Sequence, residues 1–213
     1  AALVLNELRE AGKIARIGIT NFNTSHLRAL LEANVPITTN QPQYSLIDVR
    51  PEKLFIPCSL QNNISQLCYG TLAGGFLSSD WIGKPEPMGP FSNRSLTKYK
   101  LIIEDFGGWD MFQQLLGCLN NIADRYDVTV PLVALRWILD RPGVTAAIVG
   151  ATSTRHIKEN LRVFEFALTD EDNLLIDSVL KKRMGPVGDC YDLERDKSGR
   201  HGQIMRYNQN DLT

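Results

Sequence analysis

The sequence has no long apolar run, no closely paired cysteines and no excess of charge of either sign, and each absence excludes a class of protein. No stretch approaches the roughly 18 consecutive apolar residues of a membrane-spanning helix. The formal net charge is −1 at pH 7, so the chain has no basic footprint for nucleic acid or for a membrane surface. We expect a cytoplasmic globular protein without those partners. An organelle stays open, because the chain starts inside a helical pattern and without a methionine.

Cysteine and histidine are scarce and widely spaced. Three of the four cysteines lie in or beside apolar runs, which favours reduced, buried thiols over a disulfide framework. The histidines share no spacing with one another or with the cysteines, so we expect no metal site. Gly-x-Ser-x-Gly, Walker and Gly-x-Gly-x-x-Gly motifs are also missing. The cysteines are Cys58, Cys68, Cys118 and Cys190.

Short apolar runs alternate with segments of helical periodicity along the chain. Strands alternating with helices indicate a parallel sheet, either half of an eight-fold barrel or a small doubly wound sheet. A segment rich in Gly, Pro, Ser and Asn over 70–108 predicts a functional loop with short helical turns at most. Residues 184–213 predict a polar, irregular tail. The predicted strands are 14–20, 35–41, 64–69 and 144–149, and the predicted helices are 3–12, one from 24, 51–61, 110–126, one from 131, one from 152–154 to about 162, and 169–183.

Polar but uncharged residues follow every predicted strand. They are amides and hydroxyls after the first two strands, a phenol and glycines after the third, and glycine with hydroxyls after the fourth. In parallel-sheet folds ligands gather at these carboxyl ends, so the residues suit a polar, neutral ring system. The four segments are Thr20–Phe22, Asn40–Gln41, Tyr69–Gly75 and Gly150–Ser153.

The fourth segment leads directly into a helix. Free backbone N–H groups with the positive helix end behind them make a generic site for a phosphate. Alternatively, Thr152 and Ser153 only cap the helix. The residues leave both interpretations open.

Four segments, taken together, resemble the aldo-keto reductase family. The likeness extends over residues 3–183, in the order and at the separations that the family shows. It implies a TIM (β/α)8 barrel of which this chain holds only the C-terminal half, about four β/α units plus extra helices. It also divides the chain into a partial oxidoreductase domain, 3–183, and a tail, 184–213. The segments are Leu8–Phe22, Asn40–Ser45, Tyr69–Leu77 and Val149–Ser153, the last followed by Glu159-Asn160-Leu161.

The resemblance implies a bound nicotinamide cofactor and assigns residues to it. Tyr69 could instead be core packing, and Glu159 a solvated helix charge. The implied contacts are Thr20, Asn21 and Gln41 to the nicotinamide carboxamide, Tyr69 stacked on its ring, Gly70, Thr71, Leu72, Gly74 and Gly75 along the pyrophosphate, Gly150, Ala151 and Thr152 at the adenosine ribose and its phosphate, His156 nearby, and Glu159 and Asn160 at the adenine.

The resemblance is less direct about whether the cofactor is NADP or NAD. Family members that prefer NADP often carry a Lys at the Gly150 position and an Arg at the His156 position, and both are absent here. The 2′-phosphate thus loses two charge-assisted contacts, for which Arg155 could substitute. We expect NADP (NADPH) in preference to NAD.

The resemblance also implies that the catalytic Asp, Tyr, Lys and His of the family lie upstream of Ala1. We therefore assign no catalytic residue and no metal ligand. We expect a truncated, NAD(P)H-dependent carbonyl–alcohol oxidoreductase that is inactive alone, acts on a small-molecule carbonyl when intact, and self-associates through open half-barrel edges. The alternatives are a non-catalytic nicotinamide-binding module, like potassium-channel β subunits, and a half-barrel without a ligand.

Overall fold

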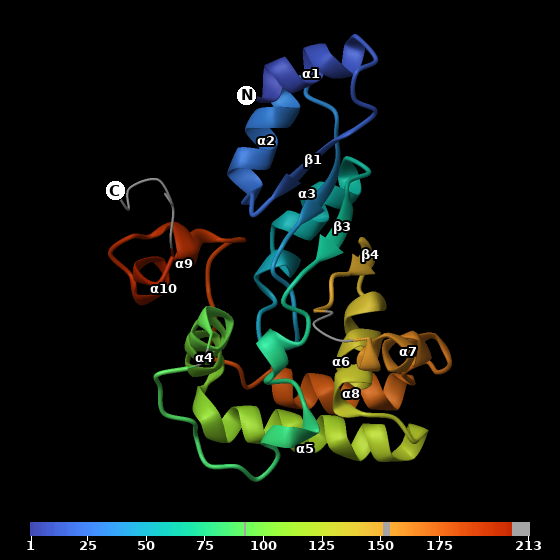
Figure 1. Ribbon diagram of the computed structural model, residues 1–213, viewed down its shortest axis with the longest axis vertical. Coiled ribbons are helices and arrows are strands. Elements are labelled where there is room, and N and C mark those ends of the chain that lie inside the picture. Colours follow the sequence, from blue (N-terminus) through green and yellow to red (C-terminus); the bar gives the residue numbers. More distant parts are fainter. Residues whose placement is uncertain (92, 151–153, 206–213) are drawn as a thin grey trace.

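Four parallel strands form the centre of the structure, a computed structural model that describes residues 1–91, 93–150 and 154–205. Their order in the sheet, β1-β2-β3-β4, is their order in the sequence (Figure 1). A doubly wound sheet reverses its strand order at a switch point, whereas neighbours in a (β/α) barrel follow one another. The order is therefore that of a barrel segment. The strands are β1 (Ile17–Thr20), β2 (Ile37–Gln41), β3 (Ser65–Cys68) and β4 (Val144–Ala147).

All four predicted strands are present, but each is shorter than predicted. β1 and β2 begin later than predicted, β3 is one residue shorter at each end, and β4 ends two residues earlier than predicted. Close pairing fixes the register between β1 and β2, because Gly18 lies opposite Thr39. A Cβ atom at Gly18 would stand 2.5 Å from the Thr39 hydroxyl oxygen, so glycine is needed for this approach.

Helices lie beside the sheet and extend beyond both of its ends. In Figure 1, α1 and α2 lie at one end, α5, α6 and α8 at the other, and α9 and α10 lie beside α4. The predicted helix over 51–61 is split into a 3-10 turn, Arg50–Glu52, and α3. The helices are α1 (Ala2–Glu10), α2 (Thr24–Glu32), α3 (Phe55–Gln61), α4 (Arg94–Phe106), α5 (Gly108–Tyr126), α6 (Val130–Leu139), α7 (Arg155–Leu161), α8 (Asp170–Leu180), α9 (Asp192–Arg195) and α10 (Arg200–Gln203).

Side-chain caps start two of the predicted helices. Asn23 accepts a hydrogen bond from the His26 backbone N–H at 3.0 Å. Thr169 and Asp172 form a reciprocal capping box at the start of α8, which satisfies two otherwise free backbone donors. Asp172 is buried and also accepts from the Tyr126 hydroxyl at 2.5 Å, so the cap ties α8 to α5.

The main hydrophobic core lies between α4, α5, α6 and α8. The apolar stripe of α5 is fully buried, as its periodicity predicts. Phe76 packs against Trp81 and Trp109 with ring centroids 4.9 and 6.2 Å apart. These rings tie the segment after β3 to α5 and give it a fixed course.

The prediction of a loop over 70–108 is wrong for its second half. Residues 94–106 form α4, a regular helix whose N-cap, Asn93, accepts from the Leu96 backbone N–H at 3.0 Å. Tyr99, Ile102 and Phe106 are buried along one face. That helical spacing was in the sequence, but the Gly- and Pro-rich residues before it hid the boundary.

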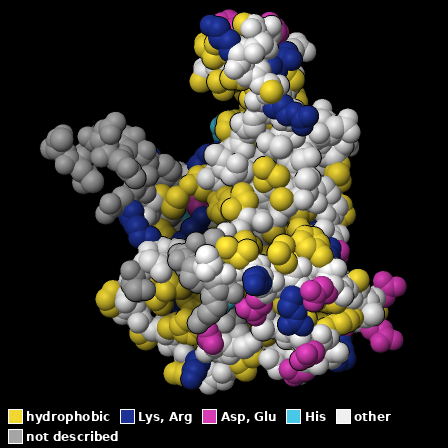
Figure 2. Space-filling model, turned by 45° about the vertical axis from the view of Figure 1, so that its right-hand side comes forward, with side chains coloured by type: hydrophobic (Ala, Val, Ile, Leu, Met, Phe, Trp, Pro, Cys, Tyr) yellow, Lys and Arg dark blue, Asp and Glu magenta, His cyan; other side chains and the backbone are white. Residues whose placement is uncertain are grey.

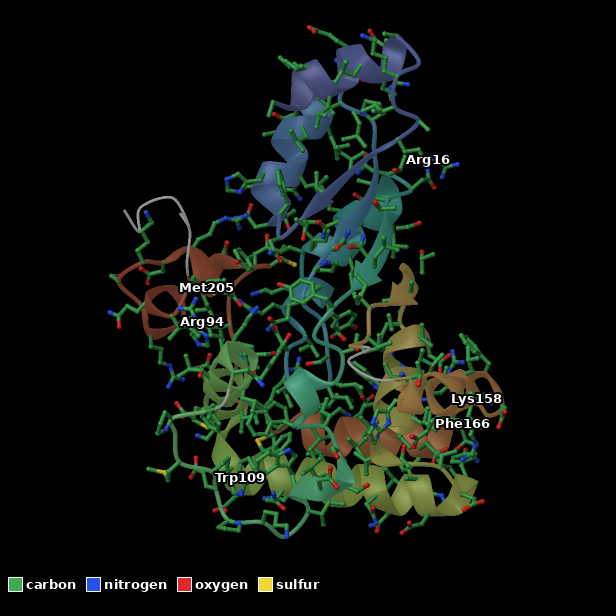
Figure 3. The ribbon with its side chains drawn as sticks, viewed as in Figure 1. Arg16, Arg94, Trp109, Lys158, Phe166 and Met205 are labelled. Atoms are coloured by element: carbon green, nitrogen blue, oxygen red, sulfur yellow. The ribbon has the colours of Figure 1, made fainter. Side chains whose placement is uncertain are left out.

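The prediction of an irregular tail is wrong for residues 192–195 and 200–203, which are helical. Buried Arg50 bridges Asp48 and Glu194 at 2.7 and 2.9 Å. Farther along, Arg94 of α4 donates to the Ile204 carbonyl at 3.0 Å, and Figure 3 shows Arg94 beside Met205. The C-terminal segment, residues 188–205, therefore packs back onto the strand ends and α4.

Candidate functional site

The carboxyl ends of β1, β2 and β3 meet in a polar cluster. The Asn21 backbone N–H donates to the Gln41 carbonyl at 3.2 Å, and the Thr20 hydroxyl reaches the same oxygen at 3.3 Å. The Tyr69 hydroxyl donates to the Asn21 side-chain oxygen at 2.6 Å. Four residues that sequence reasoning assigned to one ligand thus lie together.

Asn21 has an unusual backbone that other residues hold in place. Its φ is +58°, a left-handed conformation that is uncommon for any residue with a side chain and tends to mark functional sites. Arg195 of the C-terminal segment donates to the Asn21 carbonyl oxygen. Since Tyr69 occupies the side-chain oxygen, the side-chain NH₂ of Asn21 is a donor that no described residue takes.

Burial raises the pKa of the Tyr69 hydroxyl well above its ordinary value. The phenol therefore stays protonated and serves as a hydrogen-bond donor to Asn21. It is poorly suited to give its proton to a substrate.

The glycines after β3 let side chains approach the backbone closely. Gly70 and Gly74 have φ values of +69° and +64°. A Cβ atom at Gly70 would lie 2.0 Å from the Tyr99 hydroxyl oxygen, and one at Gly74 would lie 2.9 Å from the Ser95 hydroxyl oxygen. Ser95 and Tyr99 of α4 thus stand directly against this loop, and sequence reasoning missed both because it missed α4.

Two cavities follow this loop toward α7. One, of about 500 Å³, has Ser95 and Tyr99 on one side and Ile148–Gly150 on the other. The next, of about 420 Å³, runs on to α7. Both are lined by Leu72, Gly75 and Gly150, so they adjoin. The first cavity also includes Gly70, Thr71 and Gly74, and the second His156, Glu159 and Asn160.

At the far end of the second cavity, a carboxylate lies between two neighbours. Glu159 accepts from the Thr129 hydroxyl at 3.3 Å and lies 3.3 Å from the His156 ring nitrogen. The predicted contacts Ala151 and Thr152 lie outside the described residues. Whether the segment before α7 holds an anion therefore stays a prediction.

Lys98 is a further group at this site that sequence reasoning missed. Its ammonium nitrogen lies over the Tyr69 ring, 5.3 Å from the centroid. Burial lowers the pKa of Lys98, although the carboxylates of Glu194 and Asp48 partly oppose this. No sequence spacing signals the pairing, because the two residues come from separate elements.

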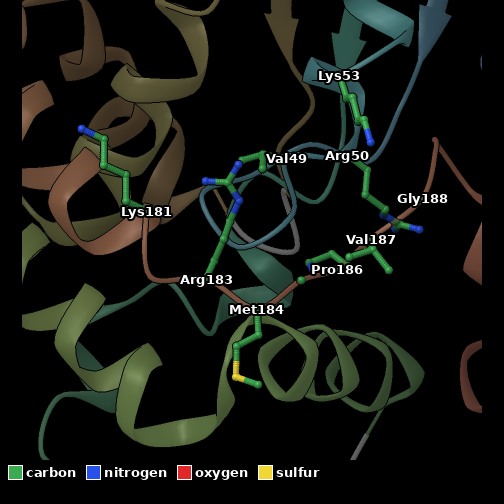
Figure 4. Close-up of a pocket in the computed structure, with 10 residues that line it drawn as sticks. Val49, Arg50, Lys53, Lys181, Arg183, Met184, Pro186, Val187 and Gly188 are labelled. Atoms are coloured by element: carbon green, nitrogen blue, oxygen red, sulfur yellow. The ribbon is translucent and has the colours of Figure 1, made fainter.

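Another cavity, of about 490 Å³, lies away from these residues and is lined by Lys53, Lys181 and Arg183 (Figure 4). The Lys181 side chain points away from Lys53, so these cations do not converge on one point.

Figure 2 shows acidic and basic side chains interspersed over the lower half of the face in view. Within the described part of the chain, no group of three or more His, Cys, Asp or Glu residues could hold a metal ion.

The described helices include none that is long and apolar enough to cross a membrane. The four cysteines are free, and three of them are buried.

Comparison with known proteins agrees with this geometry. The aldo/keto reductase family matches residues 1–181. The aldo-keto reductase YhdN of Bacillus subtilis is 30% identical over 192 residues, which are 88% of this chain and 55% of that protein. The NADH-specific methylglyoxal reductase of Escherichia coli is 29% identical over 173 residues, 81% of this chain and 51% of that protein. The chain thus spans about half the length of these curated relatives.

Solved structures show the same fold. The glycerol dehydrogenase of Gluconobacter oxydans superposes with a TM-score of 0.70 at 26% identity, over 86% of this chain and 54% of that one. An aldo/keto reductase of Klebsiella pneumoniae, in complex with NADP and acetate, gives 0.62 at 23% identity, over 88% and 55%. The four-stranded unit is part of this α/β barrel, and the chain belongs to the aldo/keto reductase family.

Proposed function

We propose that these 213 residues form the cofactor-holding part of an NAD(P)H-dependent carbonyl reductase. The observation that carries the proposal is the meeting of Asn21, Gln41 and Tyr69 at one edge of the sheet, where adjoining cavities lead away to α7. A dinucleotide needs a ring site and a phosphate path in one continuous line. The strand ends supply both.

The groups present fit a nicotinamide dinucleotide. The Asn21 NH₂ and the exposed Gln41 amide match the donor and acceptor of a carboxamide. The Tyr69 ring offers a stacking face, and the Gly70–Gly75 backbone offers N–H groups to a pyrophosphate. Gly150 has nothing within 4 Å of a Cβ position, which leaves its backbone open to a ligand. When bound, the cofactor would supply the hydride for a carbonyl carbon.

We favour NADP over NAD, although the charged side chains that NADP-preferring family members often carry at the Gly150 and His156 positions are absent here. Supporting this, the Klebsiella structure holds NADP. The E. coli relative is NADH-specific, so relatives differ in this property. Direct comparison of NADPH with NADH binding decides the preference.

We also propose that these residues alone do not reduce a carbonyl. The Tyr69 phenol lies at the site, but it is committed to Asn21 and its pKa is raised by burial. The same observation favours the second candidate, a nicotinamide-binding regulatory module without catalysis. A small carbonyl substrate, a cytoplasmic location and the division at residue 183 remain parts of the proposal.

Fluorescence titration with NADPH tests the proposal. We expect saturable binding, weakened about fivefold in Asn21→Gly, which removes the amide but suits the positive φ, since a lost hydrogen bond costs about 1 kcal/mol. Asn34→Gly is a matched control, because Asn34 has nearly the same φ, +57°, and precedes β2 at the opposite end of the sheet. A folded protein that binds neither NADPH nor NADH would overturn the proposal.

An aldehyde assay then tests the proposed inactivity of the chain alone, which both candidates share. We expect no NADPH oxidation above a blank for the chain alone. Steady oxidation that is lost in Tyr69→Phe would place the proton donor within these residues and contradict the proposed inactivity.

A further inference from the structure

Lys98 of α4 lies among three tyrosine rings from different parts of the chain. Its ammonium nitrogen is 5.3 Å from the ring centroid of Tyr69, 5.7 Å from that of Tyr99 and 5.8 Å from that of Tyr191. Tyr69 follows β3, and Tyr191 precedes α9. The fold thus gathers separate segments around one cation, at distances where the ring faces attract it.

The charge of Lys98 is not cancelled by direct contact. No carboxylate of the described residues lies within ion-pair distance of its nitrogen. Asp48 and Glu194 influence it from farther away, but both bind Arg50 at 2.7 and 2.9 Å. Arg50 offsets one of these two negative charges and the other acts on Lys98 from beyond ion-pair distance, so it is the Lys98 ammonium that stands at the Tyr69 ring.

Tyr69 stands between Lys98 and the proposed nicotinamide position. Lys98 lies over one face of the ring, so a nicotinamide stacked on Tyr69 would have to use the other face. The hydrogen bond from the Tyr69 hydroxyl to Asn21, at 2.6 Å, fixes the ring between the two. Any charge on a stacked ring would then face the Lys98 ammonium through the half-buried phenol ring, where water screens the interaction only in part.

We propose that Lys98 determines which redox state of the cofactor binds more tightly. The oxidised nicotinamide ring carries a positive charge and the reduced ring is neutral. A fixed ammonium behind Tyr69 therefore repels the oxidised form and leaves the reduced form unaffected. It also competes for the electron-rich ring face, which weakens stacking of a cation further. The effect favours loading of NADPH and release of NADP⁺, as carbonyl reduction requires. The inference rests on the proposed function.

The ratio of two dissociation constants tests it. We expect Kd(NADP⁺)/Kd(NADPH) to fall about three- to twentyfold in Lys98→Met, the range for unit charges roughly 9 Å apart at an effective dielectric constant of ~60 to ~20. Lys98→Arg keeps the charge and should restore the ratio. Lys100→Met is the matched control, because Lys100 lies on the same helix but is paired with Glu86 and Glu104 at 2.7 Å each.

The outcomes separate this inference from the function on which it rests. If wild-type protein binds both forms and Lys98→Met leaves their ratio unchanged, Lys98 has no such role. An equal fall in Lys100→Met would also overturn the inference, since it would show a general charge effect. If the wild-type protein binds neither form, the proposed function fails, and the inference with it.

Discussion

The Tyr69 hydroxyl donates a 2.6 Å hydrogen bond to the side-chain oxygen of Asn21, a residue 48 positions earlier in the chain. This bond joins the ends of β3 and β1 across β2. It orients the phenol ring and the Asn21 amide together, so that both can face one ligand. Positioning of either group therefore depends on the other.

Removing the hydroxyl should weaken cofactor binding without removing the ring. We expect Tyr69→Phe to raise the Kd for NADPH about fivefold, the effect of roughly one lost hydrogen bond. Tyr69→Leu should raise it further, because the stacking face is lost as well. Titrations of the three proteins check the order. Equal affinity in wild type and Tyr69→Phe would show that the hydroxyl does not position Asn21.

Crowding at Gly70 predicts how much the free energy of unfolding falls when one methyl group is added there. Gly70 and Gly83 have φ values of +69° and +68°, but a Cβ atom meets Tyr99 at Gly70 and nothing within 4 Å at Gly83. Gly83→Ala should therefore cost about 1 kcal/mol, for the backbone conformation alone. Gly70→Ala should cost at least about 1 kcal/mol more. Urea unfolding measures both, and equal costs would contradict the close approach of Tyr99.

The ion pair between Arg50 and Glu194 predicts how acid affects stability. Burial alone would raise the pKa of Glu194, but the hydrogen bonds and charge of Arg50 outweigh it and lower that pKa. When a carboxyl group has a lower pKa in the folded than in the unfolded protein, its ionised form stabilises the fold. This stabilisation is complete above the unfolded-state pKa and is lost as the pH falls through the folded-state pKa. We therefore expect the free energy of unfolding to fall below about pH 4.5.

Glu194→Gln tests this account. At pH 7 it should destabilise the protein by about 3 kcal/mol, because Arg50 is left buried with one partner fewer. Below pH 4.5 the gap between variant and wild type should narrow. Glu165→Gln is the control, since the Glu165 carboxylate is exposed and pairs with Arg162 at the surface. A constant gap from pH 7 to pH 3 would rule out this role for Glu194.

Free strand edges predict self-association of the chain alone. In the described part of the chain, β1 and β4 each pair on one side only. Such edges present unpaired backbone groups to other chains. We expect sedimentation velocity at micromolar concentrations to show dimers or larger species. A compact monomer at all concentrations would count against this prediction.

The sequence predicted the helices and strands that depend on residues close together in the chain. The apolar positions of α5 and the polar start of α8 involve residues a few positions apart, so periodicity and composition predicted these two helices. Where a boundary lacked such a signal, prediction failed. Asn93 caps α4 at the end of a Gly- and Pro-rich stretch, and the composition of that stretch dominated the interpretation.

The rest of the site depends on contacts between distant positions. Arg195 reaches Asn21 across 174 residues, and Lys98 meets Tyr69 and Tyr191 only after folding. No spacing rule links such residues. The resemblance to a family supplied the expected cofactor contacts. The structure adds Arg195, which holds the Asn21 backbone, and Lys98, which places a charge beside Tyr69.

The most direct measurement of the central claim is an NMR titration of side-chain amides with NADPH. If the strand ends bind the nicotinamide, the amide signals of Asn21 and Gln41 should shift together with the backbone signals of Gly70–Gly75. Those of Asn62, bonded to the Cys58 carbonyl on α3, should stay fixed. Shifts confined to the cavity of Lys53 and Arg183, or no shifts in folded protein, would contradict the account.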